Sequence, residues 1–119
     1  IALGQAIRGA LGNKRGIGRY GFLLPMDESL VNVALDFGGR FYLDFKAKFP
    51  ESHVGDLPCD MISHVFHSLA EHMQANLHIS VTGKNTHHMV EACFKGFGRA
   101  LRQAIQIDGN EMPSTKGIL

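Results

Sequence analysis

Two adjacent histidines and a nearby carboxylate are the residues of this chain best suited to metal chemistry. His87, His88 and Glu91 lie close together in sequence, within a segment whose apolar spacing predicts a helix over residues 86–107. On a helix Glu91 shares a face with either histidine, whereas consecutive residues diverge by about 100° around the axis. We therefore predict that His87 and His88 serve two different metal ions, with Glu91 able to assist one of them.

The mixture of nitrogen and oxygen donors fits Mn²⁺, Fe²⁺ or Zn²⁺ and does not discriminate well among them. Each ion needs further ligands, and His64, on a predicted neighbouring helix, is the best internal candidate. Weaker candidates are three more of the seven histidines, His67, His72 and His78. The alternative interpretation is that His87 and His88 are exposed polar residues at a helix start and that Glu91 is a solvated charge.

Five side chains that could together bind a phosphate are Arg19, Arg40, Lys95, Ser114 and Lys116. The two arginines follow loop glycines beside predicted strands, and the last two residues lie in a segment with a flexible backbone. Cations and hydroxyls of this kind make strong hydrogen bonds to phosphate oxygens. Taken singly, each is commonly a solvated surface residue. Lys14 and Arg15 are expected to be surface charges, although such a pair could also meet a neighbouring subunit.

The composition indicates a single globular domain without a general affinity for polyanions. The chain has 119 residues, of which 45% are hydrophobic and 19% charged, and its net charge is +1. Nucleic-acid and membrane-surface binding need a bulk cationic field, so neither partner is expected. Cys59 and Cys93 lack a metal-binding spacing and are predicted to be reduced thiols in a cytoplasmic protein. No apolar run approaches the length of a membrane span.

The first eleven residues repeat a later part of the chain. Without a gap, residues 1–11 align with residues 95–105, so that Gly4 falls on Gly98 and Arg8 on Arg102. If this match is a duplication, a first His-His-x-x-Glu motif belongs just upstream of Ile1. The sequence therefore predicts the later part of a duplicated protein, with one ligand cluster retained and one absent.

The predicted fold class is α+β, a four-stranded sheet with two helices on one face, preceded by the last helix of the absent half. Hydrophobic periodicity predicts helices over 1–11, 60–73 and 86–107 and strands over 20–24, 30–37, 41–47 and 76–81. We expect the first three strands to form a meander and 50–58 to be a loop. The expected divisions are a terminal helix of the first half (1–12), a βββαβα half-repeat (13–107) and a phosphate-binding tail (108–119).

Several longer motifs follow one another along the whole chain. They are Gly12 to Ile17 with Arg19, Pro25 to Glu28, Leu35-Asp36 with Gly39-Arg40, Asn85 to Glu91, Phe94-Lys95 with Arg99 to Ala104, and Pro113 to Gly117. With these motifs in this order, the sequence resembles the imidazoleglycerol-phosphate dehydratase family of histidine biosynthesis.

The resemblance implies two βββαβα halves of the ribosomal protein S5 domain 2-like fold. It implies a large homo-oligomer, an octahedral 24-mer built from trimers, with pairs of Mn²⁺ ions at subunit contacts. By resemblance the metal ligands are His64, His87, His88 and Glu91, of which Glu91 and His88 are also catalytic. The five candidate phosphate-binding residues above would hold the substrate phosphate. The chain departs from the family by lacking the first half-repeat, which it is expected to need.

The implied reaction removes water from imidazoleglycerol phosphate to give imidazoleacetol phosphate. The carbon-bound proton that is lost has no adjacent carbonyl, and a metal ion bound to the substrate imidazole can supply the missing acidity. Glu91 is a candidate to move a proton, although the absent half could supply the base instead. Two alternatives remain open from the residues alone: a non-catalytic metal-binding or assembly fragment, and, more weakly, a metal-dependent hydrolase.

Overall fold

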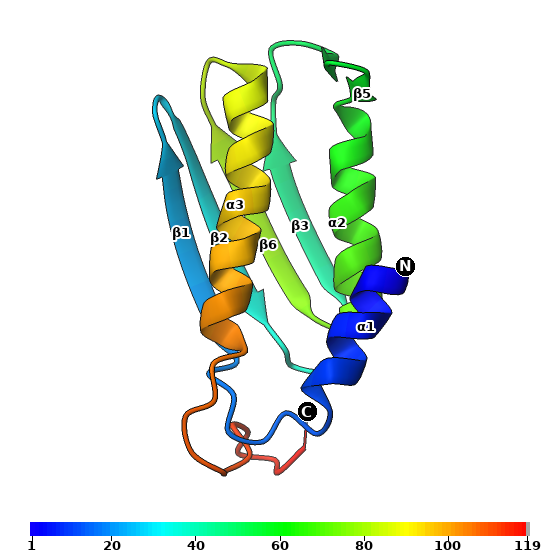
Figure 1. The fold of residues 1–119 in the computed structure, drawn as a ribbon, viewed down its shortest axis with the longest axis vertical. Coiled ribbons are helices and arrows are strands. Elements are labelled where there is room, and N and C mark those ends of the chain that lie inside the picture. Colours follow the sequence, from blue (N-terminus) through cyan, green and yellow to red (C-terminus); the bar gives the residue numbers. More distant parts are fainter. Residues whose placement is uncertain (119) are drawn as a thin grey trace.

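The computed structural model describes residues 1–118, except for the side chains of residues 20–23. Three of its elements are helices, and two of these lie on one face of the main sheet (Figure 1). The elements in chain order are α1 (Ala2–Leu11), β1 (Tyr20–Met26), β2 (Ser29–Asp36), β3 (Tyr42–Ala47), β4 (His53–Val54), β5 (Leu57–Pro58), α2 (Asp60–Met73), β6 (Asn76–Thr82) and α3 (Thr86–Ala104).

The main sheet has the strand order β1-β2-β6-β3. β1 pairs with β2 and β2 with β6 in antiparallel fashion, whereas β3 lies parallel to β6 at the edge. The predicted meander is therefore wrong for its third strand. Alternation identified β3 as a strand but carries no information about its partner, and a parallel pair becomes possible because α2 provides the long crossover it requires.

The core lies between the sheet and the two helices that cover one of its faces, α2 and α3 (Figure 1). Alternate residues of β2, including Val31 and Val33, point into this layer together with Leu77 and Ile79 of β6. From the helices, Phe66 of α2 and Phe97 of α3 meet edge to face with ring centroids 5.7 Å apart. The predicted α+β class, with helices on one face of a four-stranded sheet, is confirmed.

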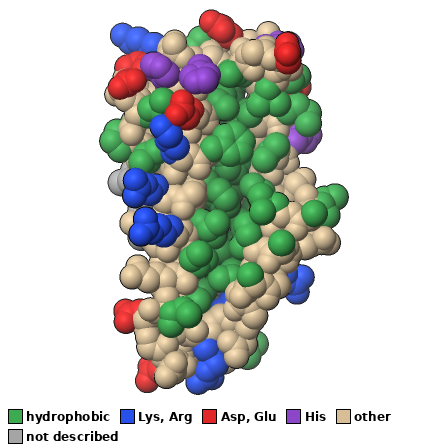
Figure 2. Space-filling view, viewed as in Figure 1, with side chains coloured by type: hydrophobic (Ala, Val, Ile, Leu, Met, Phe, Trp, Pro, Cys, Tyr) green, Lys and Arg blue, Asp and Glu red, His purple; other side chains and the backbone are tan. Residues whose placement is uncertain are grey.

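α1 packs against the later turns of α2 through a glycine. A Cβ atom on Gly4 would lie 2.9 Å from the His72 Cβ and 3.0 Å from the Leu69 carbonyl oxygen, so the two helices touch closely there. The opposite side of α1 stays exposed, including Leu3 and Ala6. Figure 2 shows a band of hydrophobic side chains along the junction between α3 and α2. This band forms an apolar surface on the helix-covered side of the described residues.

The loop before β1 and the tail after α3 hold each other in place. The Gly16 and Gly18 amides donate to the carbonyl oxygens of Glu111 and Gln106, at 2.8 and 2.7 Å. Gly16 has a φ of +75°, and a Cβ there would lie 1.9 Å from the Gly109 carbonyl oxygen, so no larger residue fits. The predicted irregular tail is present, but α3 ends at Ala104, earlier than expected.

Two smaller expectations also need correction. Residues 50–58, predicted to be a loop, contain the short antiparallel pair of β4 and β5. Lys14, predicted to be a surface charge, is only 7% exposed, and its Nζ donates to the Phe37 carbonyl oxygen at 3.3 Å. Burial lowers the pKa of this amine. Of the helices in residues 1–118, none is long and apolar enough to cross a membrane.

Candidate functional site

The head of α3 is fixed by hydrogen bonds to the turn that precedes it and to the loop that follows β3. Asn85 is the N-cap, with extended backbone, and its side-chain oxygen accepts from the His88 amide at 3.1 Å. This satisfies one of the amides that a helix start leaves without an intrahelical partner. Thr86, which is buried, accepts from the Glu51 amide through its hydroxyl at 3.0 Å. His87 and His88 therefore project from a helix turn whose backbone is anchored.

The two imidazoles have different carboxylate partners. His87 Nε2 lies 3.3 Å from a Glu91 oxygen, and the other Glu91 oxygen pairs with Lys95 Nζ at 2.6 Å. The His87 and His88 rings are 6.2 Å apart between centroids, with planes 67° apart. The hydrogen bond from Lys95 is the main reason that the pKa of Glu91 is lowered. Such an arrangement suits two neighbouring ions better than one ion shared by both rings.

Glu28 is a member of this cluster that sequence reasoning missed. It lies at the tip of the β1–β2 hairpin, and one carboxylate oxygen accepts from His88 Nδ1 at 2.8 Å. This bond lowers the pKa of Glu28 to about 2 and raises the pKa of His88. The sequence offered one signal for Glu28, the adjacent acidic pair Asp27-Glu28 in the predicted turn of the Pro25 to Glu28 motif.

The other candidate histidines do not join this cluster. His64 is exposed on α2, which begins at the same end of the molecule as α3 (Figure 1). His72 Nδ1 lies 2.8 Å from the Ser68 carbonyl oxygen, and His78 lies beside Asp44 on the sheet face away from the helices. Among residues 1–118, no three His, Cys, Asp or Glu side chains are placed to hold one ion together. The donor types at the head of α3 fit a borderline divalent metal, although no pair of them has a third candidate ligand for the same ion among residues 1–118.

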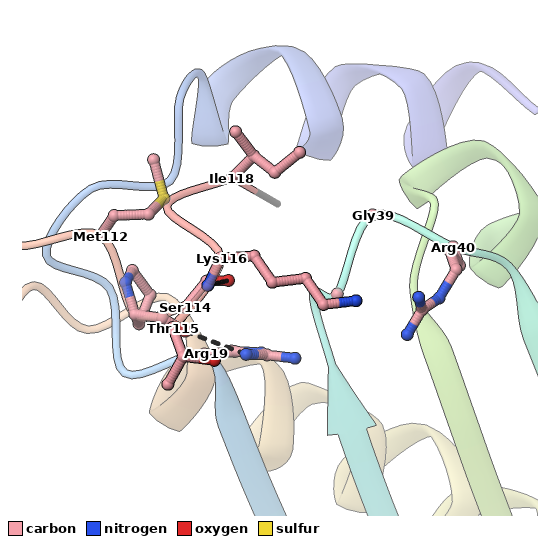
Figure 3. Close-up of a pocket in the computed structure, with 10 residues that line it drawn as sticks. Arg19, Gly39, Arg40, Met112, Ser114, Thr115, Lys116 and Ile118 are labelled. Carbon is pink, nitrogen blue, oxygen red and sulfur yellow. Dashed lines mark hydrogen bonds between the residues drawn. The ribbon is translucent and has the colours of Figure 1, made fainter.

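A cleft at the opposite end of the molecule gathers most of the predicted phosphate-binding residues. Its volume is about 830 Å³, and its polar and cationic lining comes from three distant segments: Arg19, Arg40, Ser114, Thr115 and Lys116. Figure 3 shows the Lys116 side chain reaching across the cleft toward Arg40, with Arg19 below it. A site with three cations and two hydroxyls is suited to a phosphate.

The three cations of this cleft are not equivalent. Arg19 forms a two-point ion pair with Asp36, one contact being Nη2 to Oδ2 at 2.9 Å, and its Nη1 donates to the Pro113 carbonyl oxygen, also at 2.9 Å. Within the described part of the chain, the Arg40 guanidinium and the Lys116 ammonium have no acidic partner. Arg40 and Lys116 therefore supply the positive charge that an anion would meet, while Arg19 shapes the cleft wall.

The candidate metal ligands His87, His88 and Glu91, called the ligand motif below, and the cationic cleft lie at opposite ends of α3. The helix has 19 residues, which separates its ends by about 28 Å at 1.5 Å per residue. Lys95 is paired with Glu91 toward the ligand end and does not line the cleft, so the five predicted phosphate-binding residues are not brought together. One small substrate cannot touch the cleft and the ligand motif of the same chain.

Comparison with known proteins identifies the group to which these features belong. The sequence matches the model of the imidazoleglycerol-phosphate dehydratase family over residues 1–101. The chain belongs to this family. It is also similar to the histidine biosynthesis bifunctional protein HisB of Legionella pneumophila strain Philadelphia 1 and of Stenotrophomonas maltophilia strain K279a, at 56% identity over 119 residues in both cases. The match covers the whole chain but only 34% and 33% of those relatives.

Solved structures of imidazoleglycerol-phosphate dehydratases have the same fold. The Staphylococcus aureus enzyme superposes with a TM-score of 0.85 and 36% identity, covering 88% of this chain and 63% of that one. The enzyme from Pyrococcus furiosus, solved in complex with (S)-C348, superposes with a TM-score of 0.87 and 35% identity, covering 100% and 66%. This chain spans about a third of the length of its curated relatives.

Proposed function

We propose that this chain forms part of an imidazoleglycerol-phosphate dehydratase, which removes water from imidazoleglycerol phosphate in histidine biosynthesis. Family membership over residues 1–101 supports the reaction class. The observation that carries the proposal is the cleft in which Arg19, Arg40, Ser114 and Lys116 converge from distant segments. A substrate with a phosphate group is the ligand that this lining fits best.

In this proposal the cleft binds and orients the substrate phosphate. Arg40 and Lys116 provide positive charge, and the Ser114 hydroxyl donates a further hydrogen bond. The tail that carries Ser114 and Lys116 is held by the bond from Arg19 to Pro113, so both residues are positioned before substrate arrives. Positioning of this kind lowers the entropic cost of reaching the reactive geometry.

The head of α3 is proposed to hold the metal ions. His87, His88 and Glu91 offer nitrogen and oxygen donors, and a pair of Mn²⁺ ions is the proposed cofactor, with Fe²⁺ or Zn²⁺ as alternatives. When bound, a metal supplies the acidity that the substrate imidazole lacks. His64, on α2, is proposed to ligate an ion shared with another chain. Glu91 is proposed to take up a proton from the substrate as well as to bind metal.

A complete site is proposed to combine parts of two copies of the chain. Because the cleft and the ligand motif of one chain are about 28 Å apart along α3, each active site needs the cleft of one partner and the α3 head of another. This supports a homo-oligomer with sites at subunit contacts, for which a large octahedral assembly is proposed. The free, buried thiols of Cys59 and Cys93 support a location in the reducing cytoplasm.

Mixing two impaired variants at a substrate concentration below the raised KM tests this shared site. In the full gene product, His88→Ala impairs the head of α3 and Lys116→Ala impairs the cleft. Co-assembled oligomers of the two variants should recover part of the turnover, because some contacts then combine an intact cleft with an intact ligand motif. If the mixed oligomers stay as inactive as each variant alone, the shared-site arrangement is wrong.

Turnover and metal content of the full gene product test the reaction itself. We expect Mn²⁺-dependent formation of imidazoleacetol phosphate, which His88→Ala abolishes together with metal uptake. His78→Ala is the matched control, because His78 lies on the sheet face away from the helices. Dehydration that survives both chelation and His88→Ala would overturn the metal mechanism, and a different product would overturn the reaction.

A second candidate is a non-catalytic metal-binding or assembly fragment. It is favoured by one observation: among residues 1–118, no three His, Cys, Asp or Glu side chains are placed to hold one ion. Assaying residues 1–119 alone, and then with a first half-repeat supplied separately, distinguishes the two. Dehydration by residues 1–119 alone would contradict this second candidate.

A further inference from the structure

We infer that Glu28 is a positioning residue for the metal site, whose carboxylate orients the His88 ring so that Nε2 is presented to a metal ion. The inference rests on the proposed metal-binding function of His88 and adds a residue from a different element of the fold. Glu28 and His88 are sixty residues apart in sequence and meet only because the β1–β2 hairpin tip lies beside the head of α3.

The Glu28 carboxylate is held at both oxygens. Oε2 accepts from His88 Nδ1 at 2.8 Å, and Oε1 accepts from the backbone amides of Asn85 at 2.8 Å and Lys84 at 3.3 Å. The hydroxyl of Ser29, a buried residue, donates to the same Oε1 at 3.2 Å. A carboxylate fixed in this way has little freedom to turn, so it can hold the imidazole ring in one orientation.

The hydrogen bond also decides which His88 nitrogen can bind a metal. An ionised carboxylate only accepts hydrogen bonds, so the proton must reside on Nδ1. Nε2 of the neutral ring then carries the lone pair. Carboxylates that accept from the distal nitrogen of a metal-binding histidine fix its tautomer and raise its basicity, and their removal typically weakens metal binding 10–100-fold.

Neighbouring groups do not provide the same support. Asp27, the other acid of the hairpin tip, is 76% exposed and lies 4.0 Å from His88 Nδ1. His87 has its carboxylate partner, Glu91, on its own helix, and that residue is itself a candidate ligand. Of the acids placed near the two histidines in the described chain, only Glu28 makes a hydrogen bond to His88 from a second element.

The test is a titration of the full gene product with Mn²⁺. Electron paramagnetic resonance measures the concentration of free Mn²⁺ at each step and so gives the affinity of each class of sites. Glu28→Ala should weaken one class of sites about 10–100-fold and leave the other class unchanged. Glu28→Gln should restore part of the affinity, because its amide oxygen can still accept from Nδ1. Asp27→Asn is the control for loss of a nearby charge. The left-handed backbone of residue 27 tolerates asparagine, and the Mn²⁺ affinity of this variant should remain near that of the wild type.

A double-mutant cycle distinguishes two roles of Glu28: positioning of the His88 ring, and stabilisation of the start of α3 through the backbone amides that Glu28 binds. If Glu28 acts through His88, Glu28→Ala should cause no further loss of Mn²⁺ affinity in a His88→Ala background. Three results would each overturn the inference. They are an unchanged Mn²⁺ affinity in Glu28→Ala, an equal weakening of both classes of sites, and a loss of affinity from Glu28→Ala that is as large in the His88→Ala background as in the wild type. Turnover is measured separately: Glu28-dependent Mn²⁺ binding without dehydration would contradict the proposed function alone. Failure of the wild type to bind Mn²⁺ would overturn both.

Discussion

Arg19 forms a two-point ion pair with Asp36, and the same guanidinium donates to the Pro113 carbonyl oxygen. Asp36 ends β2, whereas Pro113 belongs to the tail that follows α3. Arg19 itself has a φ of +65°, an uncommon conformation for a residue other than glycine, and its amide donates to the Ala104 carbonyl oxygen at 2.7 Å. This residue connects the sheet to the tail and thereby builds one wall of the cleft.

Arg19→Met should therefore loosen the tail. The variant loses the ion pair and the bond to Pro113, so amide hydrogen exchange should accelerate in residues 108–118. Arg40→Met is the matched control, because it removes a cation from the same cleft and should leave exchange in the tail unchanged. Equal acceleration in the two variants would show that charge in the cleft, and not the Arg19 tether, holds the tail.

Arg40→Met and Lys116→Met should weaken binding of the proposed phosphorylated substrate in the full gene product. A hydrogen bond to a charged group contributes about 1.5–3 kcal/mol, which corresponds to a rise in KM of roughly 10–150-fold at 1.4 kcal/mol per tenfold. Lys46→Met, on the sheet and paired with Asp44, is the control for loss of a surface cation. An unchanged KM in both cleft variants would remove this cleft from the substrate site.

Gly96→Ala should destabilise the chain, whereas Gly98→Ala on the same helix should not. A Cβ at Gly96 would lie 2.6 Å from Val31 Cγ1 and 2.9 Å from Val33 Cγ2, so α3 would have to move off the sheet. Overpacking of this kind costs about 1–3 kcal/mol. A Cβ at Gly98 meets no atom within 4 Å, and alanine is favoured over glycine there by about 1 kcal/mol. Denaturant unfolding of the two variants measures the difference, and destabilisation of similar size would indicate that Gly98 also lies in a close contact in the assembled protein.

Cys93 and Cys59 should resist thiol reagents while the protein is folded. Burial raises the pKa of Cys93 to about 12 and also raises the pKa of Cys59. The thiolate is the reactive form, so labelling at mildly alkaline pH should be slow in the native state and rapid in guanidinium chloride. Mass spectrometry after a short pulse of iodoacetamide counts the modified thiols. Fast labelling of native Cys93 would mean that α3 opens readily from the sheet.

The hydrogen bond between Glu28 and His88 should make the stability of the metal-free protein depend on pH. The pKa of Glu28 falls from 4.5 to about 2, so its contribution is fully present above pH 4.5 and is lost as the pH falls toward 2. The pKa of His88 is raised above 6.5, so its contribution is fully present below pH 6.5 and is lost as the pH rises through the raised value. The difference in Tm between the wild type and Glu28→Gln should therefore be largest between pH 4.5 and 6.5. A difference that does not vary with pH would contradict this assignment.

The local features of this protein could be predicted from its sequence. Apolar spacing located α2 and α3, and alternation located the strands, because helical and strand periods place residues on one face irrespective of the remaining chain. The same periodicity placed Glu91 beside His87 and made the two histidine rings diverge. The segments that contribute Arg19, Arg40 and Lys116 to the cleft were also recognisable from their loop glycines and charges.

Only the tertiary structure decided which of these segments meet. β3 does not continue the expected meander but pairs with β6 at the edge of the sheet. Lys14 is buried, and its Nζ donates to the Phe37 carbonyl oxygen. Glu28 acquired its importance from a contact with His88 across the hairpin tip and α3. Strand pairing and helix docking depend on crossovers and on packing between distant elements, which local periodicity does not encode. For the same reason, the order of the residues did not reveal that the candidate metal ligands and the cationic cleft lie at opposite ends of one helix.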